Sequence, residues 1–202
     1  MFLGLVGKSC SGKNYVGQLL QERGYEVWDL DVLCHEALTL EENVQAVVKA
    51  FGSEVLENGV VCRKTLSRLV FENLAKRFDL EEILYPWLVK KVVSYEGSSV
   101  VFLNGALLRR AALDAYCTFI VYVDAPYEDR LKRALSRDGI TEQAFEKREE
   151  AQGDVDFREN QYKAPILVIN NAEGIKNLEL IRQINIICDR IEMISNKGNE
   201  NQ

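Results

Sequence analysis

Short apolar runs alternate along this chain with longer segments in which apolar positions recur every three or four residues. The short runs predict strands buried on both faces, and the longer segments predict amphipathic helices. The expected strands are 2–6, 25–28, 99–103, 119–123 and 165–169. The expected helices are 14–22, 32–38, 41–51, 64–77, 80–95 and 176–193. This alternation is typical of an α/β domain with a five-stranded parallel sheet flanked by helices.

Local signals add detail to this pattern. Asn58-Gly59 predicts a turn, and Pro86 should kink the helix that contains it. Residues 126–162 form a charged, largely helical stretch between the last two strands. After Ile194 the chain becomes polar, and we expect residues 195–202 to be a flexible tail.

The composition narrows the classes of function. The net charge is −6, with 31 acidic and 25 basic residues, whereas a nucleic-acid-binding surface needs a basic balance or stripe. No apolar run approaches the ~20 residues of a membrane span. The cysteines are odd in number, widely spaced and without a CxxC pair, which indicates free thiols in a reducing compartment. We therefore expect a cytoplasmic protein that binds neither nucleic acid nor membranes.

A glycine-bounded segment follows the first strand directly. It fits the pattern GxxxxGK[ST] at every position but the last: Gly7-Lys8-Ser9-Cys10-Ser11-Gly12-Lys13-Asn14. The backbone N–H groups of such a loop and of the helix start converge on phosphate oxygens, and Lys13 adds a positive charge for the β- and γ-phosphates. Strand, loop, lysine and helix in this order predict a nucleoside triphosphate site, in preference to a chance Gly-Lys turn.

The second strand ends in two carboxylates. Asp29 and Asp31 lie two residues apart, so on an extended segment both side chains point to the same side. Ligands bind at the carboxyl ends of parallel strands, where a carboxylate can accept a hydroxyl proton or hold a Mg²⁺-bound water. Asp31 could instead cap the following helix. His35, the single histidine, has no second ligand at zinc spacing, and we expect it to border a pocket.

The charged stretch carries three regularly spaced arginines. Arg130, Arg133 and Arg137 follow one another at intervals of three and four, so one helical face presents all three. In a mobile lid they would close over the γ-phosphate and stabilise its charge. On an ordinary solvated helix they would pair with Glu128 and Glu142 instead.

In their order and spacing these features resemble the dephospho-coenzyme A kinase family over nearly the whole length, about residues 2–187. Beyond the phosphate loop the matching landmarks are Trp28-Asp29-Leu30-Asp31, His35-Glu36, Phe51-Gly52, Gly59, Arg63, Val70-Phe71, Leu80-Glu81, Pro86, Ala106-Leu107-Leu108, Arg133, Arg137-Asp138, Ala151-Gln152 and Asn171. The resemblance implies a P-loop kinase core at 1–39 and 97–194, a helical substrate lobe at about 40–96 and a lid at about 127–162.

The family's reaction moves the γ-phosphoryl group of ATP to the ribose 3′-hydroxyl of dephospho-coenzyme A, with Mg²⁺, in the last step of coenzyme A synthesis. The resemblance implies that Asp31 orients or deprotonates this hydroxyl and that Lys13 and the loop amides hold the ATP phosphates. Arg133 and Arg137 would act from the lid. The implied substrate contacts are Asp29, Asp31, His35, Arg63 and Leu107, and the implied metal contacts are Asn14 and Asp29.

Five positions depart from the family's pattern. Asn14 replaces a Ser or Thr hydroxyl, Asn104 stands where Asp is frequent, Tyr85 where His usually precedes Pro86, and Arg109-Arg110 where an apolar–acidic pair is found. Since an amide oxygen is an uncommon Mg²⁺ ligand, either the aspartates after the second strand hold the cation or catalysis is weaker. The alternatives are another small-molecule or nucleotide kinase, and a weakly active or inactive nucleotide-binding homologue. We expect a monomer or weak homo-oligomer.

Overall fold

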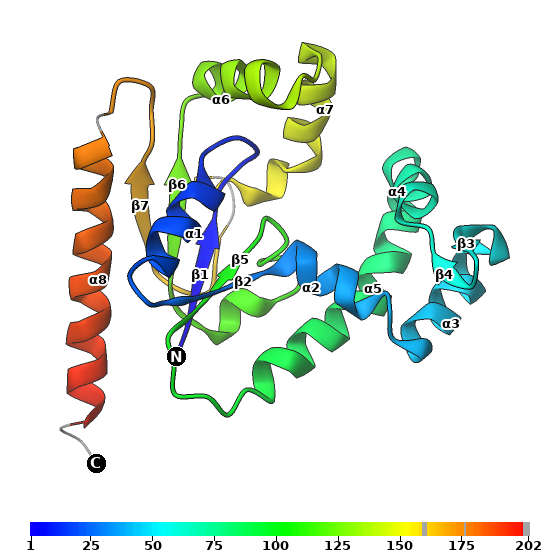
Figure 1. Ribbon diagram of the computed structural model, residues 1–202, viewed down its shortest axis with the longest axis horizontal. Coiled ribbons are helices and arrows are strands. Elements are labelled where there is room, and N and C mark those ends of the chain that lie inside the picture. Colours follow the sequence, from blue (N-terminus) through cyan, green and yellow to red (C-terminus); the bar gives the residue numbers. More distant parts are fainter. Residues whose placement is uncertain (159–160, 176, 200–202) are drawn as a thin grey trace.

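A five-stranded parallel sheet forms the centre of the computed structural model, which describes residues 1–158, 161–175 and 177–199 (Figure 1). The strands are β1 (Phe2–Val6), β2 (Glu26–Asp29), β5 (Val101–Asn104), β6 (Cys117–Asp124) and β7 (Ile166–Asn170). Their order is β2-β5-β1-β6-β7, and every neighbouring pair is parallel. The predicted fold class is confirmed. β1 lies in the middle of the sheet, so its carboxyl end opens between two neighbouring strand ends.

Helices surround this sheet and build a lobe beside it (Figure 1). In chain order they are α1 (Lys13–Gln21), α2 (Leu30–Ala37), α3 (Glu41–Phe51), α4 (Arg63–Glu72), α5 (Leu74–Val93), α6 (Tyr127–Arg133), α7 (Glu142–Ala151) and α8 (Asn177–Asn199). The shorter elements are 3₁₀ turns at Ser53–Val55, Leu113–Tyr116 and Gly153–Val155, a π-helical segment, η3 (Ala134–Asp138), and a hairpin of β3 (Leu56–Glu57) and β4 (Val60–Val61). None of the described helices is long and apolar enough to cross a membrane.

The two faces of the sheet pack against different helices. Phe102 belongs to the core that α1 and α8 complete, and its neighbour Leu103 to the core beneath α2 and α5. Successive strand residues alternate between the two faces, and both faces are dry. This explains the nearly unbroken apolar strands of the sequence.

A third apolar cluster lies beside the sheet. It joins the end of α2 to α3, α4, α5 and the hairpin, with Phe51, Leu66 and Leu84 among its buried residues. Leu88 and Val92, farther along α5, belong to the core beneath the sheet. Because α5 is built into both cores, it fastens this lobe to the sheet.

The boundary between α4 and α5 differs from the prediction. The apolar pattern predicted one helix to residue 77 and another from residue 80, whereas the break lies at Asn73. The Asn73 side chain accepts hydrogen bonds from the backbone N–H groups of Ala75 and Lys76, at 2.9 and 3.3 Å. This N-cap satisfies N–H groups that a helix start otherwise leaves without partners, and α5 therefore begins at Leu74.

Two other segments extend the prediction. The turn at Asn58-Gly59 is confirmed, with φ angles of 52° and 80°. It joins β3 to β4, two short strands that were not predicted. Helix α8 continues past Ile194 to Asn199, so residues 195–199 of the expected flexible tail are helical. Residues 200–202 lie outside the described residues.

Gly4 marks a point of β1 where the core leaves no room for a side chain. A Cβ atom there would lie 2.7 Å from Leu108 Cδ2 and 2.9 Å from Ile120 Cγ1, and both side chains are fully buried. We expect Gly4→Ala to lower the free energy of unfolding by about 1–3 kcal/mol, as overpacking does, in urea denaturation. Gly153→Ala is the control, since its Cβ would meet no atom of the described residues within 4 Å. Equal stability of the two variants would contradict this packing.

Candidate active site

Residues 7–14 comprise the loop after β1 and the first two residues of α1, at the carboxyl edge of the sheet. The loop is closed by a hydrogen bond from Ser11 N–H to the Lys8 carbonyl, at 3.1 Å. Gly12 precedes α1 with φ 94°, and a Cβ there would lie 2.1 Å from Asn171 Nδ2. A Cβ on Gly7 would lie 2.6 Å from the Val123 carbonyl oxygen. Only glycine fits at these two positions.

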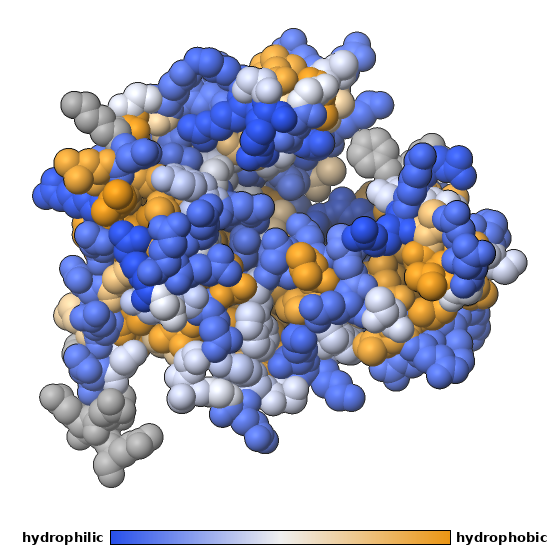
Figure 2. Space-filling model, viewed as in Figure 1, coloured by the Kyte–Doolittle hydropathy of each residue, from blue (hydrophilic) through white to orange (hydrophobic). Residues whose placement is uncertain are grey.

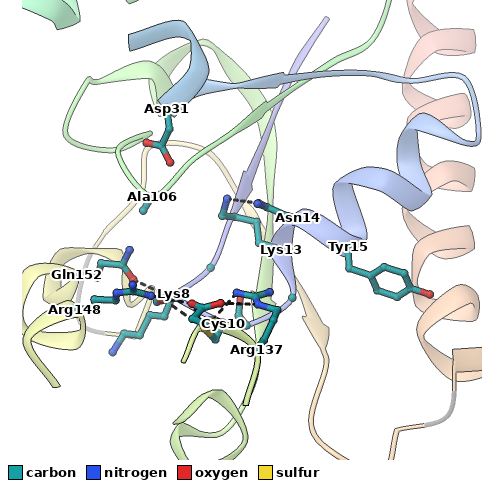
Figure 3. Close-up of a pocket in the computed structure, with 15 residues that line it drawn as sticks. Lys8, Cys10, Lys13, Asn14, Tyr15, Asp31, Ala106, Arg137, Arg148 and Gln152 are labelled. Carbon is teal, nitrogen blue, oxygen red and sulfur yellow. Dashed lines mark hydrogen bonds and ion pairs between the residues drawn. The ribbon is translucent and has the colours of Figure 1, made fainter. Parts of the chain in front are cut away.

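A cavity of about 250 Å³ lies over this loop, and all of its residues from Gly7 to Asn14 line it (Figure 3). Other segments contribute the remaining lining residues: Tyr15, Asp31, Ala106, Arg137, Asp138, Arg148 and Gln152. The structure thus brings Lys13, Asp31 and Arg137 to one cavity. Five of these lining residues were not predicted as site residues from the sequence: Tyr15, Ala106, Asp138, Arg148 and Gln152. Three of them, Ala106, Asp138 and Gln152, lie in the family landmarks.

Lys13 extends along the cavity toward Asp31 (Figure 3). Its amino group donates hydrogen bonds to Asn104 Oδ1 at 2.7 Å and to Asn14 Oδ1 at 3.0 Å. Burial lowers the pKa of Lys13 below its usual value of 10.5, and the charges of Asp31 and Asp29 oppose this shift. The ammonium ion is therefore held by neutral oxygens, with the carboxylates acting over a longer range.

Lys8 has a different environment from Lys13. It forms ion pairs with Asp156 at 3.4 Å and with Glu149 at 3.9 Å. The neighbouring Ser9 N–H donates to Gln152 Oε1 at 2.7 Å. The loop is thus tied to α7 and the turn after it, and protein carboxylates already balance the charge of Lys8.

Asp29 and Asp31 do not share an extended segment, contrary to the prediction. β2 ends at Asp29 and α2 begins at Leu30. Asp29 Oδ1 accepts hydrogen bonds from the N–H groups of Asp31 and Val32, at 2.9 and 3.1 Å, so Asp29 is the N-cap of α2. The alternative role of Asp31 as the cap is therefore wrong.

The Asp31 side chain points into the cavity instead (Figure 3). Burial, and then the nearby charge of Asp29, raises the pKa of Asp31 above its usual 3.8, against the opposing effects of Lys13 and His35. A carboxylate with a raised pKa holds a proton more readily than an exposed one, which suits a group that receives a proton from a hydroxyl.

The arginines of the charged stretch divide between two roles. Arg130 is 5% exposed and pairs with both carboxylate oxygens of Glu149 on α7. Arg133 donates to three backbone carbonyls, those of Cys10 at 3.2 Å, Ser11 at 3.3 Å and Asn171 at 2.7 Å. Both side chains thus hold the loop and its surroundings in place. Neither pairs with Glu128 or Glu142, because α6 aims these arginines inward.

Arg137 lies on η3, where the α-helical spacing from Arg133 is lost. Its side chain is 67% exposed, lines the cavity and pairs with Asp138 at 2.8 Å. Arg148 of α7 reaches the same carboxylate at 3.0 Å and also lines the cavity. These two guanidinium groups line the cavity together with the basic side chains of Lys8 and Lys13.

A family model of dephospho-CoA kinase matches residues 1–177. The chain belongs to the dephospho-CoA kinase family. Curated dephospho-CoA kinases from Fusobacterium nucleatum and Parasynechococcus marenigrum are 30% and 34% identical to it over 196 and 182 residues, which cover 95% and 87% of this chain and 98% and 90% of those proteins. The chain is accordingly a kinase, and the alternative functions are not favoured.

Solved structures agree with this family fold. TT1252 from Thermus thermophilus superposes with a TM-score of 0.75 at 28% identity, covering 94% of this chain and 97% of that one. Dephospho-CoA kinase from Campylobacter jejuni superposes with a TM-score of 0.61 at 18% identity, covering 98% and 97% of the two chains, and supports the fold alone. The fold is that of the P-loop kinases.

The substrate residues expected of a dephospho-CoA kinase do not all meet at this cavity. Arg63 Nη1 lies 2.9 Å from His35 Nδ1, and this contact joins α4 to α2. Neither residue lines the cavity. Because a guanidinium can only donate, His35 Nδ1 is the acceptor in this contact. Leu107 is 7% exposed and packs in the core, and its neighbour Ala106 lines the cavity instead.

One oxygen of each expected Mg²⁺ ligand already accepts hydrogen bonds within the protein. Asn14 Oδ1 accepts hydrogen bonds from Lys13 and Asn104, and Asp29 Oδ1 accepts two from α2. Within the described residues, no group of three or more His, Cys, Asp or Glu side chains could hold a metal ion. Asn14 and Asp29 therefore do not form a preformed cation site by themselves.

The buried Arg130–Glu149 pair predicts a large stability effect. Arg130→Met would leave the Glu149 carboxylate, with a side chain only 15% exposed, with just the 3.9 Å contact to Lys8, at a cost of about 3–5 kcal/mol of unfolding free energy. Lys132→Met breaks an exposed pair with Glu173, with side chains 67% and 57% exposed, and should cost at most about 1 kcal/mol. Denaturant unfolding of both variants measures the difference, and similar costs would rule out the structural role of Arg130.

Proposed function

We propose that this kinase transfers the γ-phosphoryl group of ATP to the ribose 3′-hydroxyl of dephospho-CoA and forms CoA, in the last step of CoA synthesis. The observation that carries the proposal is the cavity in which Lys13 of the phosphate loop faces Asp31 of α2. A positive charge for the phosphates and an acceptor for a hydroxyl proton are the two groups that this transfer requires. Family membership supports dephospho-CoA as the acceptor.

ATP would bind with its phosphate chain over the loop. The free N–H groups of the loop and the start of α1 donate to phosphate oxygens, and Lys13 contacts the β- and γ-phosphates. Arg137 and Arg148 line the same cavity and would meet the negative charge that spreads over the transferred group. Arg133 supports this arrangement indirectly, through the loop carbonyls that it holds.

The acceptor would occupy the cleft between α4, α5 and α7, a cavity of about 740 Å³ (Figure 2). Its lining mixes apolar and cationic side chains and ends at Gln152, which also lines the loop cavity: Ser67, Val70, Leu74, Arg77, Arg110, Lys147, Glu150, Ala151 and Gln152. Dephospho-CoA combines a diphosphate with an uncharged arm, which suits such a lining. Residues of about 40–96 would hold this acceptor, and residues of about 127–162 would close over ATP.

Mg²⁺ would enter with ATP, where it neutralises phosphate charge. Because Asn14 and Asp29 already accept hydrogen bonds within the protein, we assign them no part in a proton or phosphoryl transfer step. Asp31 orients the hydroxyl and receives its proton, and Lys13 holds the phosphates in line with it.

A coupled ADP-release assay with an acceptor panel tests this function. Dephospho-CoA should support turnover, with the new phosphate on the ribose 3′-oxygen by ³¹P NMR, while shikimate and adenosine should not. Lys13→Ala should lower kcat/KM by about 10²–10³-fold, because it removes a charge that stabilises the transferred phosphoryl group. Turnover of another alcohol alone would refute the acceptor, and a nearly unaffected Lys13→Ala would refute the phosphate-loop assignment.

Asp31→Asn should lower the turnover rate and raise the thermal stability of the protein. Without a proton acceptor, kcat should fall by about 10²–10⁴-fold, with ATP affinity within a few-fold of the wild type. Since the pKa of Asp31 is raised in the folded state, its ionised form costs stability at neutral pH, and this cost disappears as the pH falls through the raised pKa. The variant should therefore have a higher Tm at pH 7.

The wild-type enzyme should lose activity on the acid side as Asp31 becomes protonated, at a pH above 3.8. Asp79→Asn is the matched control, because Asp79 is an exposed carboxylate on α5 with a side chain 49% exposed. Unchanged turnover of Asp31→Asn, or a Tm below that of the control, would contradict the role given to Asp31.

A further inference from the structure

Three side chains form a closed hydrogen-bonded triangle beside the phosphate loop. Lys13 Nζ donates to Asn104 Oδ1 at 2.7 Å and to Asn14 Oδ1 at 3.0 Å, and Asn104 Nδ2 donates to Asn14 Oδ1 at 3.4 Å. Figure 3 shows the Lys13 amino group beside the Asn14 amide. Each of the three side chains is therefore bound to both of the others.

The fold fixes Asn104 in this triangle. It lies at the carboxyl end of β5, opposite Leu5 in the register with β1, and is 4% exposed. A Cβ on Gly17 of α1 would lie 3.8 Å from its Nδ2 atom, so α1 packs directly over it. A side chain buried between a strand end and a helix is held in one orientation, and it transmits that orientation to Lys13.

The chemistry of an amide fits both contacts of residue 104. Its oxygen accepts from the ammonium ion and its NH₂ group donates to Asn14, whereas an ionised carboxylate can only accept. A carboxylate would also form an ion pair with Lys13 and offset the charge that the phosphates need. An amide orients the ammonium ion and leaves that charge available.

The same triangle defines the role of Asn14. Its oxygen receives hydrogen bonds from Lys13 and Asn104, which occupy the two lone pairs of an amide carbonyl. A cation at this oxygen would have to displace both donors, one of which is itself positively charged. The Asn14 oxygen thus serves as a hydrogen-bond acceptor for Lys13 and Asn104.

We propose that Asn104 is a positioning residue for phosphoryl transfer, which together with Asn14 directs the Lys13 ammonium ion toward the phosphates, and that Asn14 belongs to this clamp instead of ligating the cation. This inference rests on the proposed use of Lys13 in phosphate binding. It does not depend on which alcohol accepts the phosphoryl group.

NMR of ¹⁵N-labelled lysine ammonium groups tests the clamp without turnover. In the full chain, the Lys13 signal, assigned by its loss in Lys13→Ala, should shift or broaden beyond detection in Asn104→Ala. Asn43→Ala is the matched control, since Asn43 is also a buried asparagine, 7% exposed, and donates to the Ala37 carbonyl at 2.9 Å in the lobe. An unchanged Lys13 signal in Asn104→Ala would overturn the proposal.

Calorimetric binding of AMP-PNP, with and without Mg²⁺, tests the consequence for the phosphates. Asn104→Ala should weaken binding by about tenfold to a hundredfold, as expected for a lost hydrogen bond to a charged group. Asn104→Asp should also weaken it, although it keeps the shape of the side chain. Binding of Asn104→Asp as tight as wild type would overturn the argument from charge.

The Mg²⁺ dependence of the same binding tests Asn14. If Asn14 serves the clamp, Asn14→Ala weakens binding but leaves the ratio of Kd values without and with Mg²⁺ unchanged. A ratio that falls toward one would show that Asn14 ligates the cation. The double variant Asn14→Ala/Asn104→Ala should lose less than the product of the single losses, because both act through Lys13. Failure of the proposed acceptor would appear only in the ADP-release assay, not in these measurements.

Discussion

A buried ammonium ion at the carboxyl edge of the sheet is the constraint on which this site depends. In the proposed function Lys13 must stay charged, yet burial lowers its pKa. Two neutral acceptors, Asn104 and Asn14, contact the ammonium ion and orient it. The carboxylates of Asp31 and Asp29 lie farther away and stabilise its charge through space. This arrangement avoids a direct ion pair, which would compete with the nucleotide.

The loop that carries this lysine is held from outside by the segment expected to be a lid. Arg130 and Arg133 donate to loop carbonyls, and Gln152 accepts a loop N–H. The sequence predicted that the arginines of this segment contact the γ-phosphate, but the π-helical segment η3 places them on different sides. Arg130 and Arg133 support the loop, whereas Arg137 lies on another face and lines the cavity with Arg148.

The two cavities are joined by the end of α7. The Ala151 carbonyl accepts hydrogen bonds from Arg77 of α5 and from Arg110 after β5, at 3.4 and 3.5 Å. The next residue, Gln152, contacts Ser9 in the phosphate loop. Arg110, one of the departures from the family's pattern, therefore lies in a continuous set of contacts that connects the helical lobe to the phosphate loop.

Local patterns in the sequence were enough for the parallel sheet, the phosphate loop and the family, because strand periodicity, glycine positions and a lysine at fixed spacing depend on neighbouring residues. The α4–α5 boundary and the cap of α2 depended on single side-chain hydrogen bonds of Asn73 and Asp29, which apolar spacing does not report. The roles of Arg130, Arg133 and Asn104 required the tertiary structure, since their partners lie far away in the sequence. The sequence determined which chemical groups are present, and the packing of the sheet against its helices decided which of them meet.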